Sequence, residues 1–173
     1  MQDFRNLIQQ EEKEIARLHF RVHETFNQKS RAPEKWKLAC REFHSYVSAI
    51  DKYIDYAYRE IQYTDPALLE FAISFLEIDP FFFRSGYIKA ELLRKLKRSD
   101  LNAKHIVRLN VILEDAVNRR GSREFKAYCR LAAIIATPKL MYILENVTEH
   151  GEASRKSRAK LMLNHIQQAT HAV

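Results

Sequence analysis

The chain has 173 residues, of which 46% are hydrophobic, 29% are charged and only three are glycine. This length suits a single domain over residues 1–173 with a sizeable core. The scarcity of glycine excludes phosphate-binding loops, Rossmann crossovers and nucleophile elbows, because those sites need closely placed glycines in unusual backbone conformations. The net charge of +7 and the aromatic content of 11% favour a folded basic protein over a disordered one.

The first 62 residues have the pattern of two long helices. In residues 3–28, apolar side chains recur at the spacings that place them on one helical face. Pro33 suits the first turn of a second helix, which continues without Gly or Pro to about Gln62. Residues 1–62 therefore predict an antiparallel helical hairpin.

Shorter helices, separated by Asp, Pro and Gly, follow in residues 65–169. Asp65-Pro66 predicts a helix start, with Asp as the cap and Pro in the first turn. Asp79-Pro80 ends that helix and starts the next one, which runs to about Leu96. Four more helices are expected at about 106–117, 125–136, 140–147 and from Gly151 to 168. The sequence therefore predicts an all-α fold with eight helices and no strand.

Residues 65–169 also have the spacing of an internal repeat. Helix starts near Pro66, Leu101 and Pro138 fall at a period in the thirties, and Ile88-Lys89-Ala90 matches Phe125-Lys126-Ala127. In this spacing the segment resembles α-helical repeat proteins of the HEAT or armadillo type. The resemblance implies an α-solenoid of about three stacked helix–turn–helix units, whose second helices line one surface. A compact helical bundle produces similar patterns and is the alternative.

Cysteine usage and hydropathy indicate the compartment. Cys40 and Cys129 each lie in an apolar helical pattern, which predicts two buried thiols in a reducing environment. The first residues lack a basic segment followed by an apolar run, so we expect no signal peptide. The longest apolar stretch, 131–136, is far shorter than a membrane span. We therefore expect a cytoplasmic protein with no membrane span.

The excess of positive over negative charge lies entirely in the second part of the chain. Residues 1–78 carry 11 Lys or Arg against 13 Asp or Glu, a net charge of −2, whereas residues 79–173 carry 18 against 9, a net charge of +9. Arg123, Lys126 and Arg130 share one helical face. Such a face attracts phosphates and binds nucleic acid in a salt-dependent way. The alternative is a solvated surface, in which cations near helix C-termini suit the helix dipole.

We expect the binding residues to be basic side chains of the second helices, with two tyrosines that could stack on bases. The candidates are Lys89, Arg94, Lys97, Arg98, Arg120, Arg123, Lys126, Arg130, Tyr87 and Tyr128. A third basic cluster in the last helix consists of Arg155, Lys156, Arg158 and Lys160. The predicted partner is a macromolecule, either a protein or a nucleic acid, and an oligomer is also possible.

Residue patterns that could support catalysis or metal binding are incomplete. His19 and His23 lie one helical turn apart without further ligands, and no histidine follows a glutamate by three residues as in di-iron bundles. Ser157 and Lys160 match an S-x-x-K motif without its partner elements, and Cys40 near His44 lies where a packed thiol is expected. We therefore predict a non-enzymatic binding or scaffold module without cofactor or metal. An enzyme with a scattered site is the weaker alternative.

Overall fold

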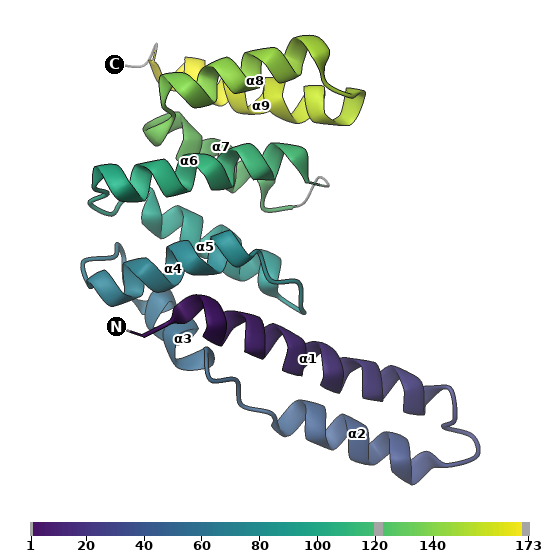
Figure 1. Ribbon diagram of the computed structural model, residues 1–173. Coiled ribbons are helices and arrows are strands. Elements are labelled where there is room, and N and C mark those ends of the chain that lie inside the picture. Colours follow the sequence, from purple (N-terminus) through teal and green to yellow (C-terminus); the bar gives the residue numbers. More distant parts are fainter. Residues whose placement is uncertain (1, 120–122, 171–173) are drawn as a thin grey trace.

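The computed structural model describes residues 2–119 and 123–170, and every regular element within them is an α-helix (Figure 1). The predicted all-α class is therefore confirmed. The helices are α1 (Phe4–Phe26), α2 (Pro33–Ser45), α3 (Asp51–Arg59), α4 (Pro66–Ile78), α5 (Ser85–Leu96), α6 (Ala103–Asn118), α7 (Phe125–Ile135), α8 (Pro138–His150) and α9 (Ala153–Thr170).

Side-chain caps explain where three of the helices begin. Before α4, α6 and α8, the side chains of Asp65, Asn102 and Thr137 accept hydrogen bonds from backbone N–H groups two or three residues later. The residue after the cap is proline in α4 and α8, where its fixed φ favours the first turn. The helix starts predicted near residues 66, 101 and 138 are therefore confirmed to within two residues.

The helices are arranged in two layers (Figure 1). α1, α4, α6 and α8 follow one another in one layer, and α3, α5, α7 and α9 follow one another in the other. The pairs α4–α5, α6–α7 and α8–α9 lie in a row. The far half of α1 packs against α2 alone, so these two helices project from the end of the row.

The hydrophobic core lies between the two layers and runs along the row of helices. Phe71, Phe75, Leu92 and Leu113 are among its fully buried side chains. α4 is buried on most of its surface, as expected for a helix that is hydrophobic all round. This continuous core fixes α5 and α7 next to each other in the second layer.

The long helix predicted from Pro33 to Gln62 is wrong, because the structure divides it into α2 and α3. The backbone N–H of Ser48 donates to the Asp51 carboxylate at 3.0 Å, and the Ser48 hydroxyl donates to Glu11 at 2.5 Å. These bonds offer the backbone an alternative to the helical pattern. The Ser48-x-x-Asp51 spacing resembles that of a capping box, a signal that the prediction of one long helix overlooked.

The helix predicted to start at Pro80 begins later, at Ser85. Asp79 and Arg84 both have positive φ values, which bend the chain between α4 and α5. Gly86 then lies in the first turn of α5, where an added Cβ would be 3.1 Å from Oε2 of Glu124. The starts of α5 and α7 therefore lie close together at this position.

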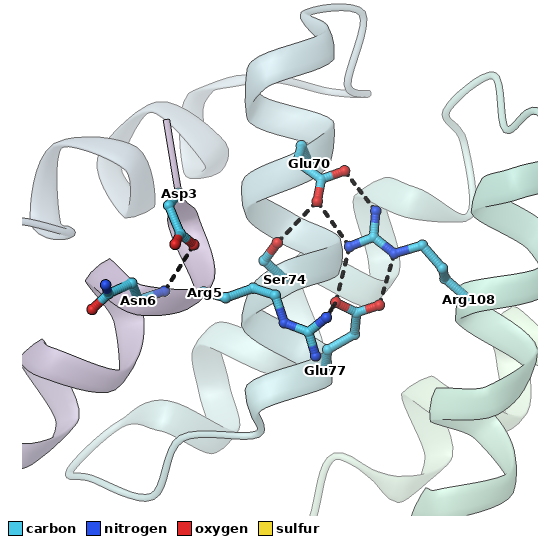
Figure 2. Close-up of polar contacts among 7 residues, drawn as sticks. All are labelled: Asp3, Arg5, Asn6, Glu70, Ser74, Glu77 and Arg108. Carbon is cyan, nitrogen blue, oxygen red and sulfur yellow. Dashed lines mark hydrogen bonds and ion pairs between the residues drawn. The ribbon is translucent and has the colours of Figure 1, made fainter. Parts of the chain in front are cut away.

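A network of charges joins the helices of the first layer (Figure 2). The Arg108 guanidinium on α6 donates to the Glu70 and Glu77 carboxylates on α4. The distances are 2.6 and 2.8 Å to the two oxygens of Glu70 and 2.7 Å to an oxygen of Glu77. Arg5 on α1 lies 3.6 Å from the same Glu77 carboxylate. The hydrogen bonds of Arg108 to both carboxylates raise its pKa. This network therefore ties α1 and α6 to opposite sides of α4.

The two thiols differ in burial. Cys129 is fully buried, as predicted, and this burial raises the pKa of its thiol to about 12. Cys40 is only half-buried, so the prediction is wrong in part, and both cysteines are free. In the described part of the chain, none of the helices combines the length and the apolar character that a membrane crossing requires.

Candidate binding face on α5 and α7

α5 and α7 begin side by side and run in the same direction (Figure 1). Their first turns are joined by the contact between Gly86 and Glu124 and by a 3.4 Å hydrogen bond from Arg123 to the Tyr87 hydroxyl. Tyr87 is 65% exposed, so this junction lies at the surface. Residues that follow Tyr87 and Arg123 at helical spacing therefore lie on neighbouring exposed faces.

Six of the candidate cations are exposed on these two helices and define the basic face. They are Arg94, Lys97 and Arg98 at the end of α5, Arg123 just before α7, and Lys126 and Arg130 within α7. Arg94 pairs with Glu91 of its own helix, where Nε lies 3.0 Å from a carboxylate oxygen. Within the described residues, the other five form no ion pair with a carboxylate. The basic face therefore carries positive charge that the fold leaves unneutralised.

Two of the ten candidate residues, Lys89 and Tyr128, are buried and do not belong to the basic face. Lys89 is buried, and its ammonium lies 2.6 Å from the Asp79 carboxylate at the end of α4, so it cannot contact an external phosphate. Tyr128 is only 3% exposed, and burial raises the pKa of its hydroxyl. Its predicted stacking on bases is therefore wrong. Arg120 lies outside the described residues.

Cations of the third basic cluster donate hydrogen bonds to backbone carbonyls near the ends of other helices. Arg158 Nε donates to the Val117 carbonyl in the last turn of α6 at 2.8 Å, and Lys156 donates to the Glu149 carbonyl in α8 at 2.7 Å. Lys95 does the same for the Tyr58 carbonyl at the end of α3. These cations satisfy carbonyls that lack partners within their helices and suit the negative end of the helix dipole. Only Lys160 of that cluster is exposed.

The titratable groups with the clearest shifts are spread over the molecule. Burial raises the pKa of Tyr63 and of Tyr46, and the Tyr46 hydroxyl also donates to the Glu11 carboxylate at 2.7 Å. Glu11 accepts a second bond from Ser48 and is itself buried. These contacts hold the segment between α2 and α3 against α1, which is a structural role.

The remaining sequence motifs lie on α1, α2 and α9. The rings of His19 and His23 have centroids 4.5 Å apart. In the described part of the chain, no three His, Cys, Asp or Glu side chains are grouped closely enough to hold a metal ion. The Ser157 hydroxyl donates to the Ala153 carbonyl of its own helix at 3.0 Å, a bond common for serine within helices.

No family model, curated protein or solved structure matches this chain.

Proposed function

We propose that this chain is a non-enzymatic binding module that holds an anionic macromolecule on its basic face. The observation that carries the proposal is the row of exposed cations on the adjacent helices α5 and α7, of which all but Arg94 lack a carboxylate partner among the described residues. Cations of one sign on neighbouring helices raise the local positive potential and attract a polyanion. An anionic partner would relieve the repulsion among these cations.

The positions of Arg123 and Lys126 favour binding over a merely solvated surface. Arg123 directly precedes the cap of α7, and Lys126 is its second residue. Cations near a helix N-terminus oppose the helix dipole, so they do not stabilise α7 in the way that basic residues stabilise a C-terminus. An anion placed there would interact favourably with both the cations and the helix N-terminus.

The architecture and the cellular location that we propose are those expected from the sequence. We propose a HEAT-like stack in which second helices form a shared binding layer, because α5, α7 and α9 are neighbours in one layer. We also propose a cytoplasmic location, where free thiols such as Cys40 and Cys129 stay reduced.

Charge reversal on the basic face tests the proposed function. The triple variant Arg123→Glu, Lys126→Glu and Arg130→Glu is compared with Lys13→Glu, Lys35→Glu and Arg41→Glu, which changes the net charge equally at exposed residues of α1 and α2. Binding of fluorescent polyglutamate is measured by anisotropy at low and at physiological salt. We expect the first variant to lose binding and the second to keep it. Equal losses in both variants would overturn the proposal.

Nucleic acid is the second candidate partner, favoured by the exposed Tyr87 ring beside Arg123. An aromatic ring beside a cation can stack on a base while the cation contacts a phosphate. Labelled single-stranded RNA, titrated in parallel with polyglutamate, tests this candidate. If RNA is the partner, its affinity should exceed that of polyglutamate and should fall when Tyr87 is replaced by alanine.

A further inference from the structure

A groove is lined by α3, by the turn that joins α4 to α5, and by residues of α1 and α2. Its volume is about 800 Å³, within the range of ligand pockets, and its apolar wall includes Ile54, Phe82 and Ile88. A second hollow of about 370 Å³ shares Arg84 and Tyr87 with the groove and extends to Arg123. The groove therefore opens toward the basic face.

The groove has a packed floor and an exposed aromatic rim. Phe82 lies edge-on against Phe75 of the core, with ring centroids 6.2 Å apart. At the rim, 76% of Phe83 and 42% of Tyr58 remain exposed. Large apolar side chains that are exposed to solvent beside a groove are typical of binding surfaces. A side chain entering this groove would meet a fixed floor and cover these rings.

Arg84 stands where the groove meets the second hollow, and its backbone is strained. Its φ of 71° lies in the left-handed region, which is uncommon for residues other than glycine. Asp79, the other residue with positive φ, caps α4 and pairs with Lys89 and Arg119. Arg84 has no such partner among the described residues, and its guanidinium lies over the Phe83 ring at 5.4 Å. Strained residues of this kind concentrate at ligand clamps.

The charges around the groove favour a polypeptide over a nucleic acid. Arg84 and Arg123 lie at the end that opens toward the basic face, whereas Asp51 and Asp55 of α3 line the opposite wall. A phosphate backbone is negative along its whole length, so these carboxylates would repel it. A polypeptide can place an uncharged side chain in the groove and acidic side chains only at the cationic end.

We propose that the groove receives an aromatic or large aliphatic side chain from an acidic segment of a partner protein, whose carboxylates lie against Arg84 and the basic face. This inference rests on the proposed function, since the basic face supplies the contact with the anion. It adds an apolar anchor, and anchors of this kind supply much of the affinity of protein interfaces. The cations would mainly guide the segment to its place.

Short fluorescent peptides separate the apolar contribution from the ionic one. The first peptide carries a Trp-Leu pair followed by a run of glutamates. The second has Ser-Ser in place of Trp-Leu, and the third has glutamines in place of the glutamates. We expect the full chain to bind the first peptide at least about tenfold more tightly than either of the others.

Two double variants locate the anchor. Tyr58→Ala with Phe83→Ala removes exposed rings from the groove, whereas Phe20→Ala with Tyr142→Ala removes exposed rings elsewhere. We expect the groove variant to bind the Trp-Leu peptide about tenfold more weakly and the Ser-Ser peptide as well as the wild type does. The control variant should change neither affinity. Circular dichroism and thermal unfolding verify that both variants are folded.

The outcomes distinguish this inference from the proposed function. If the Ser-Ser peptide binds through the basic face and Trp-Leu adds no affinity, the inference is wrong and the proposed function stands. If neither acidic peptide binds at low salt, both are wrong. If labelled RNA displaces the Trp-Leu peptide and binds equally well to the groove variant, a nucleic acid is the partner and the inference is overturned.

Discussion

Arg108 in one layer of the molecule and Arg123 and Lys126 in the other differ in whether a carboxylate contacts them. Arg108, in the layer of α4 and α6, donates to both Glu70 and Glu77 and is half-buried. Arg123 and Lys126, in the layer of α5 and α7, are exposed and form no ion pair among the described residues. The comparison teaches that positive charge alone does not identify a binding surface. Its pairing within the fold separates structural cations from those available to a partner.

Replacing Arg108 by methionine should have the largest effect on stability. Glu70 and Glu77 would keep partly buried negative charges without their shared partner, so we expect the free energy of unfolding to fall by about 2–3 kcal/mol. Urea unfolding followed by circular dichroism measures this change. The matched variant Arg130→Met should stay within about 0.5 kcal/mol of the wild type. Equal losses of stability at the two positions would show that pairing with carboxylates does not separate structural cations from exposed ones.

Lys95→Met tests a structural cation of the second layer. Its buried ammonium donates to the carbonyl groups of Tyr58 and Glu60 at the end of α3. Losing these bonds should lower the free energy of unfolding by about 1–2 kcal/mol. Lys97→Met, two residues further along, is the exposed control and should change stability much less. An effect of Lys97→Met as large as that of Lys95→Met would show that exposure does not separate the two classes.

Acidification should act on the first layer through Glu70. Hydrogen bonds from Arg108 hold the pKa of the Glu70 carboxyl below its usual value. Because the folded pKa is lower than the unfolded one, this stabilisation is complete above the unfolded pKa and is lost as the pH falls through the folded pKa. Below about pH 5, the wild type should therefore lose stability more steeply than Arg108→Met. Parallel curves in urea unfolding would contradict this role of Arg108.

Single charge reversals on the basic face should have the smallest effects on stability, with opposite signs at the two helix ends. Lys126→Glu places a negative charge in the first turn of α7 and should raise the free energy of unfolding by about 0.3–0.5 kcal/mol at low salt. Lys97→Glu, at the end of α5, should lower it by a similar amount. Precise urea titrations measure both values. A loss of stability at Lys126 would mean that this cation supports the fold.

Sequence reasoning predicted what depends on local spacing and missed what depends on distant residues. The caps Asp65 and Thr137 and the shared face of Arg123, Lys126 and Arg130 follow from neighbouring positions. Glu70 and Glu77 lie seven residues apart on one face, but nothing local identifies Arg108 as their partner. Lys89 was misassigned for the same reason, because only the fold places it against Asp79.

The groove beside Arg84 also lay beyond sequence reasoning. Phe81 and Phe83 are exposed, and large exposed rings of this kind are typical of contact surfaces. The sequence could not show that α3 would lie opposite them, because residues 46–50 were assigned to a continuous helix. The break at Ser48 turns α3 toward α5 and so forms the second wall.

A polyanion should bind the layer of α5 and α7 and leave the layer of α4, α6 and α8 unoccupied. Nuclear magnetic resonance of the isotope-labelled full chain, titrated with polyglutamate at low salt, distinguishes the two layers. We expect the amide shifts to concentrate in residues 84–98 and 123–134. Shifts of equal size around Lys104 and Lys139, which are exposed cations of the other layer, would contradict it.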